Sequence, residues 1–193
     1  MGGMKVGLVH HPIVGETHIG DAYFIHEGDG FAVVAVADGL GHGKDAELAS
    51  QRAIRYIGDH LEKTPIAMLE GCHQVLHGTR GAVLAIARID IGAGTLMHAG
   101  LGNIETRIVS EEKVFRPVTV NGIVGHQARK FRQESFAFHP GDMLVMHSDG
   151  ISDRFEISTL ARTRDPQMLA NQIAQTHGKD HDDQLLLIAR WDA

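Results

Sequence analysis

The sequence has a single cysteine, Cys72, and it has neither a long apolar run nor an excess of basic residues. One cysteine excludes an internal disulfide framework and gives little support to a zinc site built on thiolates. A cysteine phosphatase would need an arginine to hold the phosphate dianion where Gly78 stands. We therefore predict that Cys72 is a buried residue without a chemical role.

No stretch approaches the roughly 20 apolar residues of a membrane span, and the N-terminus lacks the patterns of a signal peptide or a myristoylation site. The 18 basic and 24 acidic side chains give a formal charge of −6 without a run of like charges. Nucleic-acid binding needs a basic patch. We therefore expect a cytoplasmic protein that binds neither nucleic acid nor membranes, and that is a monomer.

With 193 residues, of which 43% are hydrophobic, the chain is long enough for one domain with a sizeable core, and we predict a single domain over 1–193. Apolar runs of strand length recur between turn signals, at 4–11, 21–28, 30–37, 81–90, 94–100, 105–110, 142–148 and 184–190. Short glycine-containing turns join several of them, which favours antiparallel hairpins.

Helical patterns interrupt the strands at three places. Two consecutive helices are predicted over 46–61 and 65–76, each with an apolar face. A third is predicted after Asp165 as N-cap, with Pro166 at its first position and Gly178 as its stop. Because many strands are apolar on both faces, something must cover each side. The sequence therefore predicts a two-sheet sandwich flanked by helices.

Acidic residues stand at the ends of four of the apolar runs. Asp38-Gly39 and Asp149-Gly150 follow two of them, Asp21 begins a third, and Asp182 and Asp183 precede a fourth. In antiparallel strands the end of one strand lies beside the start of its neighbour. We therefore predict that these acids converge on one edge of the sandwich.

Several carboxylates at one site repel each other and stay ionised together only when a cation neutralises them. Oxygen ligands favour Mg²⁺ or Mn²⁺ over Zn²⁺. Gly39 lets the backbone come close, so its carbonyl can serve as another ligand. Two such ions about 3.5–4 Å apart, bridged by a carboxylate and a water, are a known device for attack on phosphorus. This pattern indicates phosphoryl hydrolysis without a protein nucleophile.

The glycines at 39, 41 and 43 also suggest a nucleotide-binding loop or kinase. A P-loop, however, would have glycine in place of Asp38 and serine or threonine in place of Asp45. A dinucleotide-binding fingerprint would need glycine where Lys44 stands. The pattern therefore favours Asp38 over the glycines as the functional feature.

Several of the 14 histidines stand in pairs. His73 and His77 lie one helical turn apart, as zinc ligands do, but without a third ligand nearby we expect surface residues. The pairs at 10/11 and 177/181 are interpreted in the same way. His42 lies in the glycine loop beside the proposed metals and is a candidate for proton transfer.

The chain resembles the metal-dependent type 2C (PPM) serine/threonine phosphatases in their bacterial SpoIIE-like branch. The resemblance is carried, in order and spacing, by GD at 20–21, VADGLGHGKDAELAS at 36–50, HSDGISDRF at 147–155 and DDQLLLIAR at 182–190. Within that branch, the short length and the stretches 79–90 and 121–153 are similar to phosphatases that reset stressosome proteins.

The resemblance implies an α+β fold, an αββα four-layer sandwich of two mainly antiparallel sheets, with a binuclear Mn²⁺ or Mg²⁺ centre between them. Asp38 would bridge the two metals, and the Gly39 carbonyl would bind as well. Asp21 would hold one metal directly or through water. Asp149 and Asp182 would hold the other, so that Asp38, Asp149 and Asp182 carry the catalysis.

Other positions match the family less directly. Asp183 stands where relatives often have asparagine and is expected to lie behind the metal ligands, and Asp153 matches a position tied to a third metal. Many eukaryotic members have an arginine before the first acidic motif, which this chain lacks, so the phosphate must be held by the metals or by another residue. They also have a histidine where Leu40 stands, which weakens the assignment of His42 as general acid.

The favoured hypothesis is a phosphoprotein phosphatase in which a metal-bridging hydroxide attacks phosphoserine or phosphothreonine. By analogy its partners are phosphorylated STAS-domain proteins of a stressosome, whose signal it resets. One alternative is a SpoIIE-like phosphatase that acts on an anti-anti-sigma factor. Another is a catalytically idle binding module with the same fold, which would be expected to have lost one of the metal acids.

Overall fold

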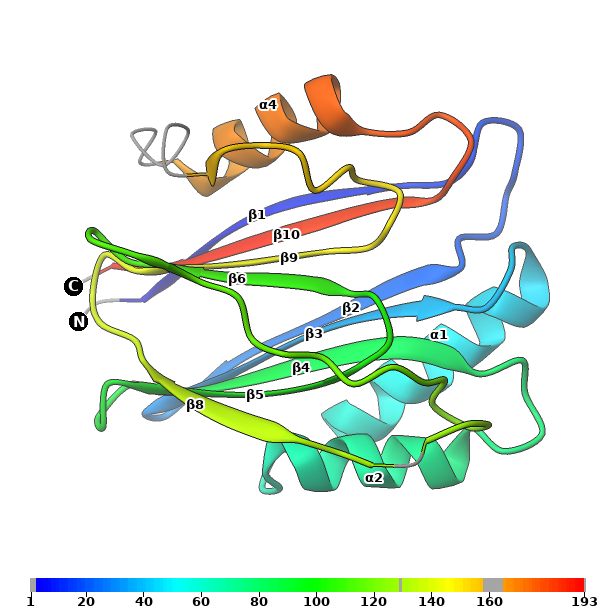
Figure 1. Ribbon diagram of the computed structural model, residues 1–193, viewed down its shortest axis with the longest axis horizontal. Coiled ribbons are helices and arrows are strands. Elements are labelled where there is room, and N and C mark those ends of the chain that lie inside the picture. The colour runs from blue at the N-terminus through cyan, green and yellow to red at the C-terminus, as the bar shows by residue number, and fades with distance from the viewer. Residues whose placement is uncertain (1–2, 129, 158–164, 193) are drawn as a thin grey trace.

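The computed structural model describes residues 3–128, 130–157 and 165–192. Its strands form two five-stranded sheets that stack face to face (Figure 1). The first sheet contains, in spatial order, β1 (Met4–His11), β10 (Gln184–Trp191), β9 (Met143–His147), β6 (Glu105–Val109) and β7 (Val114–Phe115). The second contains β2 (Asp21–Gly28), β3 (Phe31–Gly39), β4 (Ala82–Asp90), β5 (Thr95–Leu101) and β8 (Gln133–Ala137).

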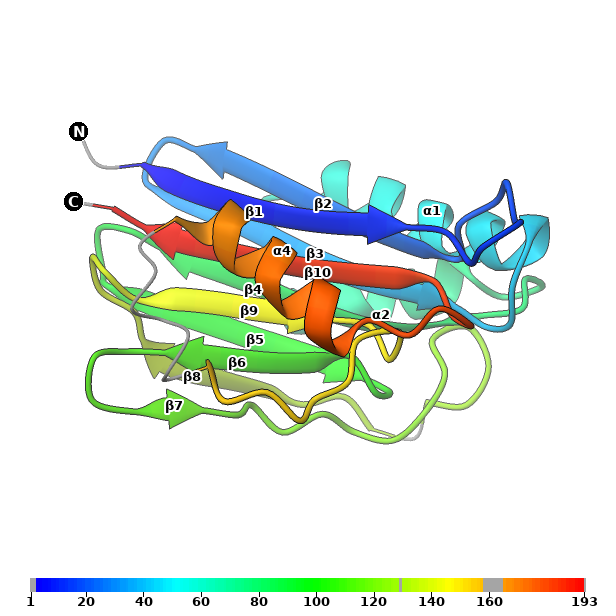
Figure 2. The ribbon, with the colours of Figure 1, turned by 90° about the horizontal axis from the view of Figure 1, so that it is seen from above.

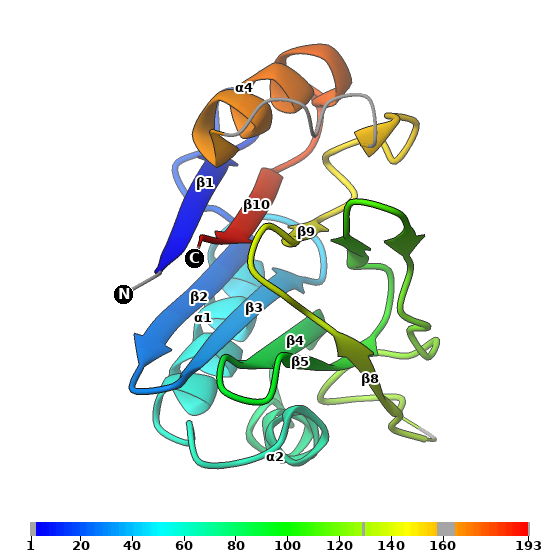
Figure 3. The ribbon, with the colours of Figure 1, turned by 90° about the vertical axis from the view of Figure 1, so that its left-hand side faces the viewer.

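All hydrogen-bonded neighbours in the two sheets run antiparallel. Helix α4 (Pro166–His177) covers the outer face of the first sheet and packs on β1 and β10 (Figure 2). Helices α1 (Lys44–Gly58) and α2 (Pro65–Val75) cover the outer face of the second sheet. Viewed end-on, the described residues form four layers, helix, sheet, sheet and helices (Figure 3). The predicted αββα sandwich is therefore confirmed.

The strands are apolar on both faces because each sheet is buried on both sides. In β3, Val34 and Val36 face the core between the sheets, whereas Val33 and Ala35 pack beneath α1 and α2. β10 shows the same alternation. Its residues Leu185 and Leu187 face the core between the sheets, and Leu186 and Ile188 pack under α4.

Local sequence signals set where the helices begin and end. The Asp165 side chain accepts hydrogen bonds from the backbone N–H groups of Gln167 and Met168, and α4 begins at Pro166 and stops at Gly178 as predicted. Helix α1 begins at Lys44 after Gly43, whose φ of 79° lies in the left-handed region. None of the described helices has the length and apolarity that a membrane span requires.

Three expectations need correction. The first helix ends at Gly58, so Leu61 lies beyond it, although Leu61 still packs against the core beneath α1 and α2. The second helix ends at Val75, and Leu76 is its C-cap residue. Strands β7 and β8 were absent from the predicted set, because β7 has two residues and the edge strand β8, Gln-Glu-Ser-Phe-Ala, lacks an apolar run.

Candidate functional site

The start of β2, the end of β3 and the start of β10 lie at one end of the sandwich, at the right of Figure 1 and away from the two termini, and the predicted acids stand at these strand ends. Asp21, at the start of β2, lies directly opposite Asp38, near the end of β3. In the other sheet, the segment after β9 carries Asp149 and runs beside the start of β10, because the Ser148 N–H donates to the Leu185 carbonyl at 3.1 Å. Two antiparallel strand pairs, β2 with β3 and β9 with β10, therefore place their acids at the same end, where the hydrogen bond from Ser148 to Asp21 joins them.

These carboxylates repel one another. Burial and then the charge of Asp149 raise the pKa of Asp38 to about 7. Burial and the nearby charge of Asp38 raise the pKa of Asp21 well above its usual range. The pKa of Asp182 is also raised, first by burial and then by Asp149. Such mutual repulsion is what a bound cation would relieve.

The glycine that follows each central aspartate allows the backbone to approach closely. A Cβ on Gly39 would overlap the backbone carbonyl of Ala46 in the first turn of α1. A Cβ on Gly150 would overlap the backbone carbonyl of Asp183. Only glycine fits at these two positions, so each Asp-Gly pair fixes an acid against a neighbouring segment of the chain.

Asp183 and Ser148 hold the site together from behind. Both carboxylate oxygens of Asp183 accept backbone N–H groups, from Gly20 at 2.6 Å and from Ile13 at 2.9 Å, which ties the β1–β2 connection to β10. The Ser148 hydroxyl donates to Asp21 Oδ2 at 2.6 Å and accepts the Leu185 N–H at 3.2 Å. Asp21 and Asp183 are 1% and 5% exposed, so these bonds lie out of reach of bulk water.

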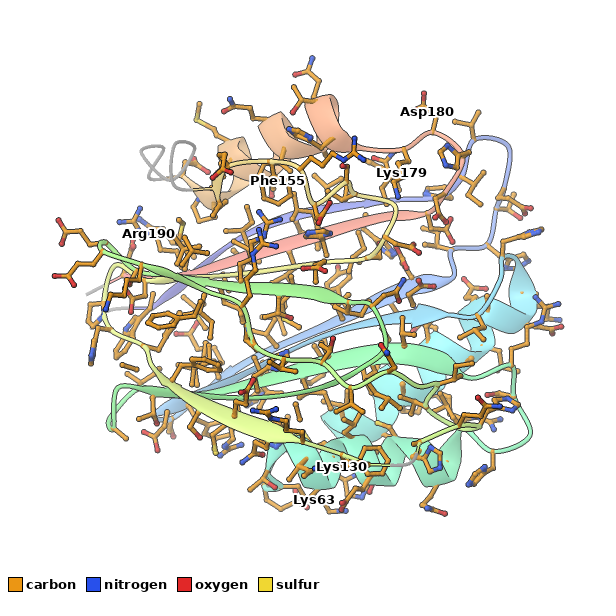
Figure 4. All side chains as sticks on the ribbon, in the orientation of Figure 1. Lys63, Lys130, Phe155, Lys179, Asp180 and Arg190 are labelled. Carbon is orange, nitrogen blue, oxygen red and sulfur yellow. The ribbon has the colours of Figure 1, made fainter. Side chains whose placement is uncertain are left out.

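Asp149 is more exposed, and the side chains of Asn103 and Lys179 donate hydrogen bonds to it. The Asn103 amide donates to Asp149 Oδ2 at 3.1 Å, and the Lys179 ammonium donates to the Asp149 backbone carbonyl at 2.5 Å. Lys179 and Asp180 lie where α4 leads into β10, and Arg190 lies at the opposite end of the molecule (Figure 4). Asn103 belongs to the turn between β5 and β6. Its hydrogen bond holds one carboxylate oxygen of Asp149 in place.

The donor set suits a hard divalent ion that retains water. No three His, Cys, Asp or Glu side chains in the described ranges form a ready-made metal group. An ion at this edge would therefore complete its shell with the Gly39 carbonyl and with water. Mg²⁺ keeps several waters and binds through one or two carboxylates, which matches this arrangement. The clustered acids with raised pKa values thus fit a divalent metal site.

Comparison with known proteins identifies the family. The family model described as Stage II sporulation protein E (SpoIIE) matches residues 28–192. The chain belongs to the SpoIIE family. It is also similar to "Phosphoserine phosphatase RsbX" of Bacillus subtilis (strain 168), with 23% identity over 170 residues that cover 88% of this chain and 85% of RsbX.

Two solved structures share the fold of this SpoIIE-family chain over nearly its whole length. A structure described as "The bacterial stressosome: a modular system that has been adapted to control secondary messenger signaling" has a TM-score of 0.92 and 31% identity, and the match covers 97% of this chain and 100% of that one. A crystal structure of RsbX in complex with magnesium has a TM-score of 0.91 and 20% identity, with 98% and 96% covered. The chain is therefore a PP2C-type protein phosphatase, and the family resemblance is confirmed.

Two predicted residues of this SpoIIE-family chain lie outside the acid cluster. His42 is exposed, and its Nδ1 lies 3.3 Å from Glu16 Oε1. Asp153 is exposed and contributes to none of the pKa shifts of the clustered acids. The backbone around Asp153 is held by the buried Arg107, whose guanidinium donates hydrogen bonds to the carbonyls of Asp153 at 2.6 Å and Phe155 at 2.9 Å. The roles of His42 and Asp153 stay predictions.

The histidine pair on α2 has a structural partner. The Nδ1 of His73 accepts the Gly125 N–H at 3.0 Å, and the Nδ1 of His77 lies 2.8 Å from the Gly125 carbonyl. Both backbone polar groups of Gly125 are thus held, which fastens the segment before β8 to α2. Cys72 is fully buried, as predicted, and burial raises the pKa of its thiol to about 12.

The sequence patterns did not reveal Ser148, Asn103 and Lys179 as contacts of the site. Ser148 carried a weak signal, because it is a polar residue between an apolar strand and an Asp-Gly pair. Asn103 follows a left-handed Gly102, with φ of 100°, in a turn that the sequence does not connect to Asp149. Such contacts depend on how the two sheets stack, so local patterns do not reveal them.

Proposed function

We propose that this chain removes phosphate from phosphoserine or phosphothreonine in STAS-domain proteins of a stressosome-type complex, and so resets a stress signal. The chemical class follows from its place among the PP2C-type phosphatases. Two similarities support the choice of substrate, one to RsbX and one to a structure described for the bacterial stressosome. The proposed partners are the phosphorylated scaffold proteins themselves.

The observation that carries the proposed chemistry is the convergence of Asp21, Asp38, Asp149 and Asp182 beside the Gly39 carbonyl. We propose that Asp38 and Gly39 hold two Mn²⁺ or Mg²⁺ ions together with Asp149 and Asp182, and that Asp21 binds directly or through water. When bound, such ions supply an acidified water and positive charge for the phosphoryl oxygens. A third ion near Asp153 remains part of the proposal.

The protein contributes the arrangement of the ligands. The Ser148 hydroxyl donates a hydrogen bond to one oxygen of Asp21, which is buried from solvent. This bond fixes the orientation of the Asp21 carboxylate. Both carboxylate oxygens of Asp183 accept backbone N–H groups. Asp183 therefore positions the β1–β2 connection and is not itself proposed as a metal ligand. Preorganised ligands of this kind favour the reacting geometry because little reorganisation is needed on binding.

The decisive experiment measures release of phosphate from a phosphorylated STAS-domain protein by the purified chain, with Mn²⁺ and with Mg²⁺. The wild type and the Asp180→Asn variant should be active, because Asp180 is an exposed acid in the same connection as Asp182. Asp38→Asn should lose activity by at least about 100-fold, the range seen when a main electrostatic group is removed. Full activity of Asp38→Asn would refute the proposed centre.

A further inference from the structure

The proposed substrate meets an electrostatic obstacle at this site. A phosphoserine side chain carries a charge of about −1.5 to −2 at neutral pH, and the edge that it must approach carries a cluster of carboxylates. A cation at the rim would complement bound metals in holding the phosphoryl group. The connection 11–20, which leads into Asp21, contains neither arginine nor lysine.

Arg80 precedes the strand that pairs with the end of β3 on the side away from β2. It lies just before β4, whose residues Ala82 and Val83 pair with Gly39 and Asp38. Its Nη1 donates to the His42 carbonyl at 3.3 Å, so the guanidinium lies over the glycine loop that follows Asp38. The side chain is 48% exposed, so a ligand in solvent can reach it.

The contacts of Arg80 leave it able to bind an anion. Its Nη2 lies 3.3 Å from Asp45 Oδ2, and the Asp45 side chain is 65% exposed, so this ion pair is weak and exchangeable. The planar guanidinium can direct two N–H groups at two phosphate oxygens.

We propose that Arg80 binds the phosphoryl group of the substrate, with phosphate oxygens replacing the Asp45 carboxylate. This inference rests on the proposed phosphatase function and adds a substrate-binding residue to it. The guanidinium lies close to the backbone of the glycine loop, since a Cβ on Gly41 would be 3.0 Å from Arg80 Nη1. The alternative is that Arg80 only ties the glycine loop to α1 through Asp45.

The test compares Arg80→Ala, Arg80→Lys and Asp45→Asn with the wild type, and uses Arg52→Ala on the exposed face of α1 as a matched control. Calorimetry measures the binding of inorganic phosphate in the presence of Mn²⁺, and steady-state kinetics measure KM and kcat for a phosphorylated STAS-domain protein. Circular dichroism checks that each variant is folded.

Arg80→Ala should weaken phosphate binding and raise KM by at least about tenfold, as expected for loss of a charge-assisted hydrogen bond. Arg80→Lys should recover part of the loss, and Asp45→Asn should bind phosphate as tightly as the wild type or more tightly. If Asp45→Asn instead reproduces the loss, or if Arg80→Ala binds phosphate normally, the proposal is wrong. An inactive wild type would refute the proposed function. The role of Arg80 is tested separately, by comparing the phosphate affinities of the wild type and Arg80→Ala.

Discussion

Replacing Asp38 with asparagine tests how strongly the clustered carboxylates oppose folding when no metal is bound. Burial and the neighbouring Asp149 raise the pKa of Asp38 from 3.8 to about 7. Because one pKa unit corresponds to about 1.4 kcal/mol, this difference corresponds to about 4 kcal/mol. The folded protein holds this proton more tightly than the unfolded chain does. The resulting stabilisation is complete below pH 3.8 and is lost as the pH rises through about 7.

Asparagine has no charge to lose, so the metal-free Asp38→Asn variant should be more stable than the wild type at high pH. At about pH 8 the free energy of unfolding should rise by up to about 4 kcal/mol, and near pH 4 the two proteins should be nearly equal. Urea denaturation in EDTA, followed by far-UV circular dichroism across this pH range, measures the difference. Asp180→Asn serves as the control for removal of an exposed acid.

Addition of Mg²⁺ should reverse the order of stability, because the wild type gains binding free energy that the variant largely loses. Equal free energies of unfolding at about pH 8 in EDTA, or a less stable Asp38→Asn, would refute the reasoning. Either result would mean that burial and the charges of its neighbours do not penalise the ionised Asp38 as its raised pKa indicates. This measurement does not require a substrate, so it stands apart from the proposed activity.

Three further predictions address the supporting residues. Gly150→Ala should destabilise the protein by about 3 kcal/mol, since its Cβ would overlap a backbone carbonyl, whereas Gly92→Ala meets only a side-chain oxygen at 3.6 Å and should leave the melting temperature unchanged. Burial lowers the pKa of His98 to about 4, so the contribution of His98 to the free energy of unfolding should fall by up to about 3 kcal/mol as the pH drops from 6.5 through 4, and the difference between the wild type and His98→Gln in urea titrations should change by this amount. Asn103→Ala, which frees Asp149 Oδ2, should weaken Mn²⁺ binding by about tenfold in calorimetry; unchanged affinity would contradict a positioning role.

Most of the fold could be predicted because its signals are local. The apolar runs that became β1, β2 and β10 have the length of strands, and the Asp165 cap and Gly178 stop bound α4 within its own sequence. The edge strand β8 could not be found in this way. Its polar sequence forms a strand because β5 offers it hydrogen-bonding partners.

The sequence by itself determined where the acids stand along the chain, and antiparallel pairing then required Asp21 to lie beside Asp38. Only the tertiary structure decided which side chains surround them. Ser148 reaches Asp21 across 127 residues, and Asn103 reaches Asp149 across 46, since the stacking of two sheets brings those segments together. The packing of the segment before β8 on α2 likewise brings His73 and His77 against the backbone of Gly125. A local sequence pattern shows which residues alternate between the two faces of a strand and which cap a helix. Contacts between distant segments depend on how the layers pack.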